Sequence, residues 1–124
     1  MNRALAALLL LFVLACNRAE SPAAPPAPPA IGNTERGRVL AAQYGCAVCH
    51  IIPGVDGPQG ALGPSLQGVA SRPLISFDAV KNTPENLVKY IENPPAMNPQ
   101  STMPALGLPP DDVKDIAAYL LTLK

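Results

Sequence analysis

The sequence predicts an all-α domain with about three main helices and long loops between them. Three stretches carry helix-capping residues or apolar residues at helical spacing, and no stretch alternates apolar and polar residues convincingly, as a strand would. A long connection rich in glycine and proline spans residues 51–71, and a second connection spans residues 96–108. Long ordered loops in a small domain usually serve a function or wrap around a ligand, so the pattern indicates one of these uses.

The first helix is expected over residues 34–44, in the stretch "NTERGRVLAAQYGC". Asn33 or Thr34 can act as its N-cap, and Glu35 lies in the first turn, where the helix dipole favours a negative charge. Gly45 follows and is the residue type that commonly ends a helix.

Two more helices are expected further along the chain. In "NTPENLVKYIENPP", Thr83 can cap the helix, Pro84 suits its first turn, and the pair Pro94–Pro95 ends it. The last helix is expected in "DDVKDIAAYLLTL", where five apolar residues share one face at helical spacing: Val113, Ile116, Ala117, Leu120 and Leu121.

The N-terminus has the three parts of an export signal. In "MNRALAALLLLFVLAC", Arg3 supplies the positive charge, residues 4–15 form the apolar segment, and cleavage is expected after Ala15. This segment is shorter than the roughly 20 residues that a membrane-spanning helix needs. We therefore expect residues 1–15 to be a signal peptide and the protein to be exported.

Cys16 directly follows the apolar segment, and "VLAC" resembles the bacterial lipobox, in which the cysteine receives a lipid. The resemblance implies a lipoprotein held at a membrane through Cys16, since acyl chains anchor proteins at membrane surfaces. Ordinary cleavage that leaves a spare thiol is the alternative. Residues 16–31 include "SPAAPPAPPA", whose prolines favour a semi-rigid tether over a disordered leader without a role. The folded domain is then expected over residues 32–124.

The charge of the chain argues against one class of function. Nine lysine and arginine residues balance nine aspartate and glutamate residues, and there is no block of basic residues. A nucleic-acid-binding protein would need such a block to contact phosphates, so nucleic acid is not an expected partner. The balance also argues against docking by long-range electrostatic steering and favours weak, largely apolar contacts.

The stretch "YGCAVCH" holds Cys46, Cys49 and His50, the only histidine of the chain. A structural zinc site needs four ligands, and the chain has no second cysteine pair or second histidine to supply them. A redox disulfide of the CxxC type normally belongs to a fold with β-strands. The third use is covalent attachment of a c-type heme, in which two thiols bond to the heme edge and the adjacent histidine binds the iron. Export fits this third use, because c-type heme is attached outside the cytoplasm.

The order of the motifs resembles that of the class I c-type cytochromes. Over residues 34–124, a helix with Gly37 precedes CxxCH, and "GPSL", a middle helix, "TMPAL" and a last helix with Tyr119 follow. The chain is also similar to the cytochrome c tail of some heme-copper oxidase subunit II proteins. The resemblance implies a class I cytochrome c fold around one covalent heme c, with the first and last helices crossing closely at Gly37, near Tyr119.

The resemblance also implies roles for individual residues. Cys46 and Cys49 would form the thioether bonds to the heme, and His50 would bind the iron. Pro64 would accept a hydrogen bond from the His50 ring through its backbone carbonyl. Met103, in the methionine-proline motif, would be the second axial ligand, and a thioether at this position favours ferrous iron.

Four other positions complete the comparison with the family's motifs. Met97 is the alternative axial ligand, although its position after two prolines also suits a methionine that fills the core. Arg72 and Asn82 are candidates to bind a heme propionate, and Asn82 is equally suited to a place just before a helix cap. Pro109 stands where relatives often have a serine or threonine cap, so no side-chain cap is implied there.

The implied function is electron transfer rather than catalysis. A heme iron with both axial positions filled would cycle between ferric and ferrous and would bind no small-molecule substrate. We expect a carrier on the periplasmic side of a bacterial membrane, anchored through Cys16, whose partners are redox proteins: a terminal oxidase, or a dehydrogenase as donor. The alternatives are a permanent subunit of an oxidase or dehydrogenase complex, and a heme peroxidase or gas sensor with an open iron position.

Overall fold

The structure is a computed structural model that describes residues 30–124. The expected signal peptide, Cys16 and the tether up to residue 29 lie outside the described residues. The elements follow one another in this order: α2 (Thr34–Gln43), α3 (Cys46–Cys49), the 3₁₀ helix η1 (Val69–Ser71), β1 (Leu74–Ile75), β2 (Val80–Lys81), α4 (Pro84–Glu92), α5 (Pro94–Met97) and α6 (Pro110–Leu120). The mostly helical fold that the sequence predicts is confirmed.

The three long helices begin within a residue of the predicted positions, and two of them have the expected caps. The Asn33 side chain accepts a hydrogen bond from the Arg36 backbone N–H at 2.9 Å and caps α2. The Thr83 hydroxyl accepts one from the Asn86 backbone N–H at 3.2 Å and caps α4. Pro109 precedes α6 and makes no side-chain cap, as its missing hydrogen-bonding group requires.

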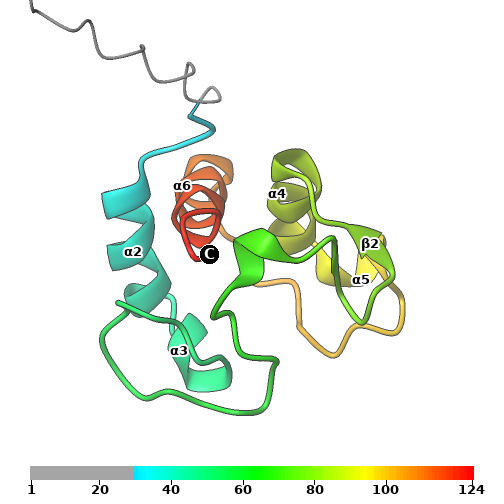
Figure 1. Cartoon of the computed structure of the whole chain (residues 1–124), viewed down its shortest axis with the longest axis horizontal. Coiled ribbons are helices and arrows are strands. Elements are labelled where there is room, and N and C mark those ends of the chain that lie inside the picture. The colour runs from blue at the N-terminus through cyan, green and yellow to red at the C-terminus, as the bar shows by residue number, and fades with distance from the viewer. Residues whose placement is uncertain (1–29) are drawn as a thin grey trace, which may run out of the picture.

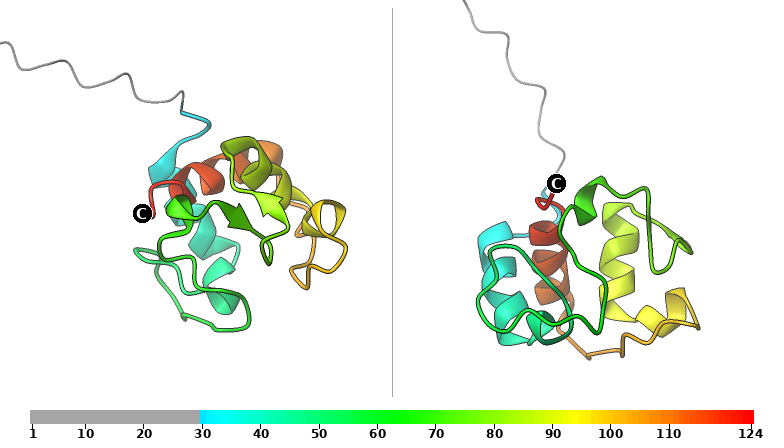
Figure 2. Two further views of the ribbon diagram at one scale, coloured as in Figure 1. Left: turned by 45° about the vertical axis from the view of Figure 1, so that its right-hand side comes forward. Right: turned by 60° about the horizontal axis from the view of Figure 1, so that its bottom comes forward.

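α6 lies at the centre of the domain, between α2 on one side and α4 on the other, as the views in Figures 1 and 2 agree. Loop 51–68 runs below the helices in Figure 1, and loop 98–109 leads from α5 back to the start of α6. The buried apolar side chains of the helices, of loop 51–68 and of the two strands form one core: Leu40, Ala41, Ala47, Ile52, Val55, Val69, Ile75, Val80, Leu87, Ile91, Val113, Ile116, Ala117 and Leu120. Within residues 30–124, no helix combines the length and the apolar character needed to span a membrane.

The crossing of α2 and α6 is the tightest contact between helices and is called the helix crossing below. A Cβ atom at Gly37 would overlap the backbone carbonyl of Asp115, so only glycine lets the two backbones approach this closely. The crossing lies at Asp115, about one turn before the Tyr119 position that the family resemblance implied. Arg36 extends across the crossing and pairs with the carboxylates of Asp112 and Asp115.

Two short elements differ from the sequence prediction. β1 and β2 pair antiparallel, with Leu74 opposite Lys81 and Ile75 opposite Val80, although no strand was predicted. Strands of two residues are too short to show an alternating pattern, which is why the sequence gives no sign of them. The second difference is α5, which forms where the two prolines were expected only to end α4, because proline suits the first turn of a new helix.

Candidate heme site

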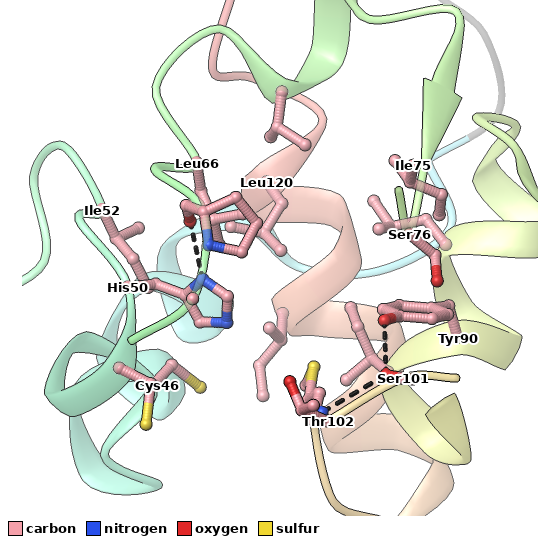
Figure 3. A pocket seen from close by; sticks show the side chains of 18 of the residues that line it. Cys46, His50, Ile52, Leu66, Ile75, Ser76, Tyr90, Ser101, Thr102 and Leu120 are labelled. Carbon is pink, nitrogen blue, oxygen red and sulfur yellow. Dashed lines mark hydrogen bonds between the residues drawn. The ribbon is translucent and has the colours of Figure 1, made fainter. Parts of the chain in front are cut away.

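A cavity of about 590 Å³ opens between the central helix α6 and the two long loops. Its lining is mostly apolar, and one face comes from α3 and the loop that follows it, the other from α4 and the loop before α6. Figure 3 shows these two faces, with Cys46 and His50 on one and Tyr90, Ser101 and Thr102 on the other. Pockets of about 300–1,000 Å³ with apolar walls and few polar groups are typical of cofactor sites.

The imidazole of His50 is held on one wall by the predicted "GPSL" turn. His50 directly follows α3, and its Nδ1 lies 2.7 Å from the backbone carbonyl oxygen of Pro64. A carbonyl only accepts, so Nδ1 carries the proton and donates, and in the neutral imidazole this leaves the lone pair on Nε2. Gly63 packs directly against the ring, and a Cβ atom at this position would overlap the ring atoms. In Figure 3 the second ring nitrogen points into the cavity.

The two cysteines stand at the two ends of α3, and both line the cavity. Both thiols are free. The spacing of three residues on a helix places them on the same side. Burial raises the pKa of the Cys46 thiol above its ordinary value, because the charged thiolate would lose its hydration there. The next loop is tied to α3 by hydrogen bonds from Gly60 N–H to the Ala47 carbonyl and from Gly63 N–H to the Cys49 carbonyl, each 2.8 Å long.

The wall that faces His50 contains Met103 and not Met97. Met103 lines the cavity, whereas Met97, at the end of α5, packs against the hydrophobic core. The backbone N–H of Met103 donates to the hydroxyl of Ser101 at 3.3 Å. That hydroxyl lies 2.8 Å from the hydroxyl of Tyr90 on α4. The loop around Met103 is thus joined to a rigid helix through two side chains, as the dashed lines in Figure 3 show.

Arg72 and Asn82, the two candidates for propionate contacts, are placed differently. Arg72 lines the cavity, and its Nη2 donates to the backbone carbonyls of Ser65 at 2.6 Å and Gln67 at 2.9 Å. Asn82 does not line the cavity; its Nδ2 donates to the carbonyls of Val69 at 2.7 Å and Arg72 at 2.9 Å. Its buried Oδ1 has no partner among the described residues. Arg72 therefore lies at the site, whereas Asn82 lies outside the cavity and binds the backbone of the segment that carries Arg72.

Sequence reasoning did not identify Tyr90 and Ser101 as parts of the site. Both hydroxyls reach it, Tyr90 from the edge of the apolar face of α4 and Ser101 from two positions before Met103. The sequence does contain one indication of this pair. Tyr90 lies beside the apolar face of its helix, and a buried phenol hydroxyl needs a hydrogen-bond partner, which a serine in the next loop can supply.

The chemistry of the residues around the cavity fits a c-type heme. Two free thiols stand beside an imidazole whose Nε2 lone pair points into the cavity, and a thioether lines the same cavity. Thiols, imidazole and thioether are the groups that attach heme and bind its iron. The remaining lining is largely apolar, as a macrocycle requires.

Known proteins match this domain over nearly its whole length. The family model described as "Cytochrome c" matches residues 34–124. "Cytochrome c2 iso-2" of Magnetospirillum molischianum is 33% identical over 91 residues, which cover 64% of this chain and 91% of that protein. "Cytochrome c2" of Rhodomicrobium vannielii is 35% identical over 105 residues, which cover 75% of this chain and 81% of that protein. "Cytochrome c-type cyt cy" of Rhodobacter capsulatus is 37% identical over 90 residues, but the match spans 63% of this chain and only 43% of that longer protein.

Proposed function

The chain belongs to the cytochrome c family, and from that premise we propose that it carries single electrons between redox proteins outside the cytoplasm. Proteins of this family carry covalently bound heme c, whose iron supplies the redox chemistry by alternating between the ferric and ferrous states. The observation that carries the proposal is that His50 and Met103 both line one cavity, and that Figure 3 shows His50 on the wall opposite Ser101 and Thr102, the residues just before Met103. A heme iron bound by both residues would have no open position for a substrate, which suits electron transfer rather than catalysis.

On the His50 side, three residues would hold the heme. Cys46 and Cys49 would form the two thioether bonds, and His50 would bind the iron through Nε2. The 2.7 Å contact from Nδ1 to the Pro64 carbonyl supports this role, because it selects the tautomer with a free Nε2. The same hydrogen bond orients the ring and raises its basicity as a ligand.

On the other side, Met103 would bind the iron through its sulfur. A thioether is a soft ligand that favours ferrous iron and raises the reduction potential relative to a second histidine. Tyr90 and Ser101 support this role by holding the backbone of the Met103 loop at a fixed distance from α4. Arg72 would place positive charge near a propionate, and Asn82 would act behind it by binding the Arg72 carbonyl.

We also propose that the protein is a lipoprotein anchored on the periplasmic side of a bacterial membrane. Residues 1–15 would be removed, Cys16 would carry the lipid, and residues 16–31 would form the tether. As a polyproline helix, the segment from residue 17 to residue 31 would reach on the order of 40 Å. A terminal oxidase or a dehydrogenase within that reach would be the partner.

Visible spectra of the oxidised and reduced full chain test the function, with Met103→Ala and Met97→Ala as matched variants. Wild type should show the absorption band of methionine sulfur bound to ferric iron. Met103→Ala should lose this band and have a lower potential, whereas Met97→Ala should keep both. The opposite pattern would give the ligand role to Met97.

Carbon monoxide separates the carrier from an enzyme or sensor. With both axial positions filled, the reduced wild type should bind it slowly and weakly, and Met103→Ala should bind it rapidly. Rapid, tight binding to the wild type would contradict the carrier and favour a heme peroxidase or gas sensor. Elution of the detergent-solubilised protein by itself on gel filtration would favour a mobile carrier over a permanent subunit.

A further inference from the structure

The loop that carries Met103 is hydrogen-bonded at one end only. Among the described residues 30–124, the segment 102–108 takes part in a single hydrogen bond, the 3.3 Å bond from the Met103 N–H to the Ser101 hydroxyl. Towards α6, the next hydrogen bond is accepted by the Pro109 carbonyl, in the first turn of that helix. A side chain on a loop is placed only as precisely as the loop is attached, so the place of Met103 depends on the residues just before it.

Asn98 fixes the turn that leads to Ser101. Its backbone carbonyl accepts from the Ser101 N–H at 2.9 Å, and its side-chain Oδ1 accepts from the Gln100 N–H at 3.0 Å. Its own N–H donates to the Pro94 carbonyl at 2.9 Å and ends α5. Asn98 thus joins the end of α5 to the turn from which the Met103 segment leaves.

The same side chain reaches the hairpin formed by β1 and β2. Its Nδ2 donates to the Ser76 hydroxyl at 2.9 Å and to the Ser76 carbonyl at 3.3 Å. In the described part of the chain, these are the only hydrogen bonds between the hairpin, residues 74–81, and loop 98–109. Ser76 lies on the same side of the cavity as Tyr90 and Ser101 (Figure 3). Because Asn98 is only 8% exposed, water cannot readily replace a lost partner of its amide.

The hairpin turn that Asn98 binds has an unusual backbone. Ser76, Phe77 and Asp78 have φ angles of 56°, 54° and 61°, and they are the only non-glycine residues with positive φ in the described part of the chain. Residues other than glycine adopt this region at a cost, so three in succession persist only where the surrounding structure holds them. The contacts between Asn98 and Ser76 hold the turn from the side of the Met103 loop, and the turn in return fixes the Asn98 amide.

We propose that Asn98 is a positioning residue for Met103: its buried amide joins the Met103 loop to the hairpin turn and so keeps the Met103 sulfur within reach of the heme iron. The inference rests on the proposed role of Met103 as axial ligand. Asn98 does not line the cavity, so it acts through the turn that ends at Ser101. Without the amide, the loop should leave the hairpin more often, and the bond between sulfur and iron should break more often.

The rate at which carbon monoxide binds to the reduced, heme-loaded full chain tests this role. The gas can bind only after the Met103 sulfur has left the iron, so at saturating gas the rate equals the rate at which the loop opens; no electron is transferred. Stopped-flow absorption in detergent solution measures it. Asn98→Ala removes the amide and keeps the backbone bonds to Pro94 and Ser101. Ser76→Gly removes only the hydroxyl partner and suits a positive φ, so it tests the same contact if Asn98→Ala does not fold.

Two control variants separate positioning from general stability. Asn86→Ala removes the same type of bond to the same hairpin, because the Asn86 Nδ2 donates to the Lys81 carbonyl at 3.0 Å. Gly37→Ala weakens the helix crossing instead. Among the described residues, neither Asn86 nor Gly37 shares a hydrogen bond with loop 98–109. Both variants should therefore open at a rate within about twofold of wild type.

We expect the loop to open about tenfold faster in Asn98→Ala and about threefold faster in Ser76→Gly. Amide hydrogen exchange should be faster at Ser101 and Met103 in both variants and unchanged in α2. Rates within about twofold of wild type in both variants overturn the proposal. An equal increase in Gly37→Ala also overturns it, because Asn98 would then act through the stability of the whole domain, and an equal increase in Asn86→Ala would assign the effect to any loosening of the hairpin.

Failure of the proposed function itself looks different. The wild type would then bind carbon monoxide rapidly and tightly, or Met103→Ala would keep the absorption band of methionine sulfur bound to ferric iron. A wild type that binds the gas slowly and loses the band in Met103→Ala, with unchanged rates in Asn98→Ala and Ser76→Gly, would overturn the role of Asn98 alone.

Discussion

Where α2 crosses α6, the two helices pack directly against each other. Gly37 brings the two backbones into contact, and Arg36 pairs with two carboxylates whose residues are 8% and 7% exposed. The Tyr44 hydroxyl donates to Asp112, and the Asn33 backbone N–H donates to Asp115 at 2.7 Å. Every polar group named at the helix crossing thus has its partner within the chain.

The walls of the cavity are built in the opposite way. Loop 51–68 is attached to α3 by a few backbone hydrogen bonds, and the Met103 loop is attached to α4 through Tyr90 and Ser101. Between these walls lies a space of about 590 Å³ that no side chain fills. The helix crossing is therefore packed by protein alone, whereas the walls of the cavity need the heme to pack against.

Removing the heme should have the largest effect and should unfold both halves of the domain. The helix crossing alone cannot supply the stability that packing around the heme provides. Without heme, the apolar walls of the cavity of about 590 Å³ lose the group that they pack against, and a small domain has only about 5–15 kcal/mol of stability to lose. We therefore expect the Cys46→Ala, Cys49→Ala double variant, prepared without heme, to lose most of its helical circular dichroism. Hydrogen exchange should find α2 and α6 unprotected. Persistent protection of these helices would show instead that the crossing folds by itself.

Opening the helix crossing should have the next largest effect. Gly37→Ala places a methyl group on the Asp115 carbonyl, so α2 and α6 must move apart, and we expect a loss of about 3 kcal/mol in the free energy of unfolding. Guanidinium denaturation of the heme-loaded protein measures it. Val39→Ala, on the exposed side of the same helix, should change stability by less than about 0.5 kcal/mol. Equal stability of the two variants would mean that the crossing accommodates the added methyl group without moving the helices apart.

The two halves also differ in how much of them the sequence predicts. The long helices carry local signals, such as the cap at Thr83 and the apolar spacing in α6, and the structure confirms them. The closeness at Gly37 followed from the family resemblance. Its ion pairs did not, because Arg36 and Asp115 are 79 residues apart and no local pattern joins them.

Around the cavity, short motifs identify the groups at the centre and not the residues that support them. CxxCH and the methionine-proline motif led to His50 and Met103, and both line the cavity. Strands of two residues, the left-handed turn at Phe77 and the amide of Asn98 leave no periodic trace. Their places depend on tertiary contacts, which a single sequence does not display.

Acid should weaken the helix crossing through Asp115. The Asn33 backbone N–H and then the Arg36 guanidinium hold the pKa of the Asp115 carboxyl below its ordinary value. The carboxylate therefore stabilises the fold above the ordinary pKa of about 4, and this stabilisation is lost as pH falls through the lower folded-state pKa. Asp115→Asn should cost about 2 kcal/mol at pH 7, and its difference from wild type should shrink toward low pH.

Asp111→Asn is the matched control for this pH dependence. Asp111 lies on the same helix and pairs with Lys114, but its side chain is 84% exposed, so the substitution should have little effect at any pH. A difference between Asp115→Asn and wild type that stays constant down to low pH would contradict the role of the Asp115 charge.

Removing the Tyr90 hydroxyl should have the smallest effect. It should loosen the wall of the cavity and leave the helix crossing unchanged. Tyr90→Phe deletes one hydrogen bond to Ser101, for which we expect a loss of about 1 kcal/mol. Hydrogen exchange should become faster in residues 100–104 and stay unchanged in α2 and α6. Ser101→Ala removes the same bond from the other side, so the double variant should lose less than the sum of the two single losses. If the losses simply add, the bond between Tyr90 and Ser101 does not couple the Met103 loop to α4. If α2 and α6 also lose protection, Tyr90 supports the whole domain, and the two halves are not as separate as their construction suggests.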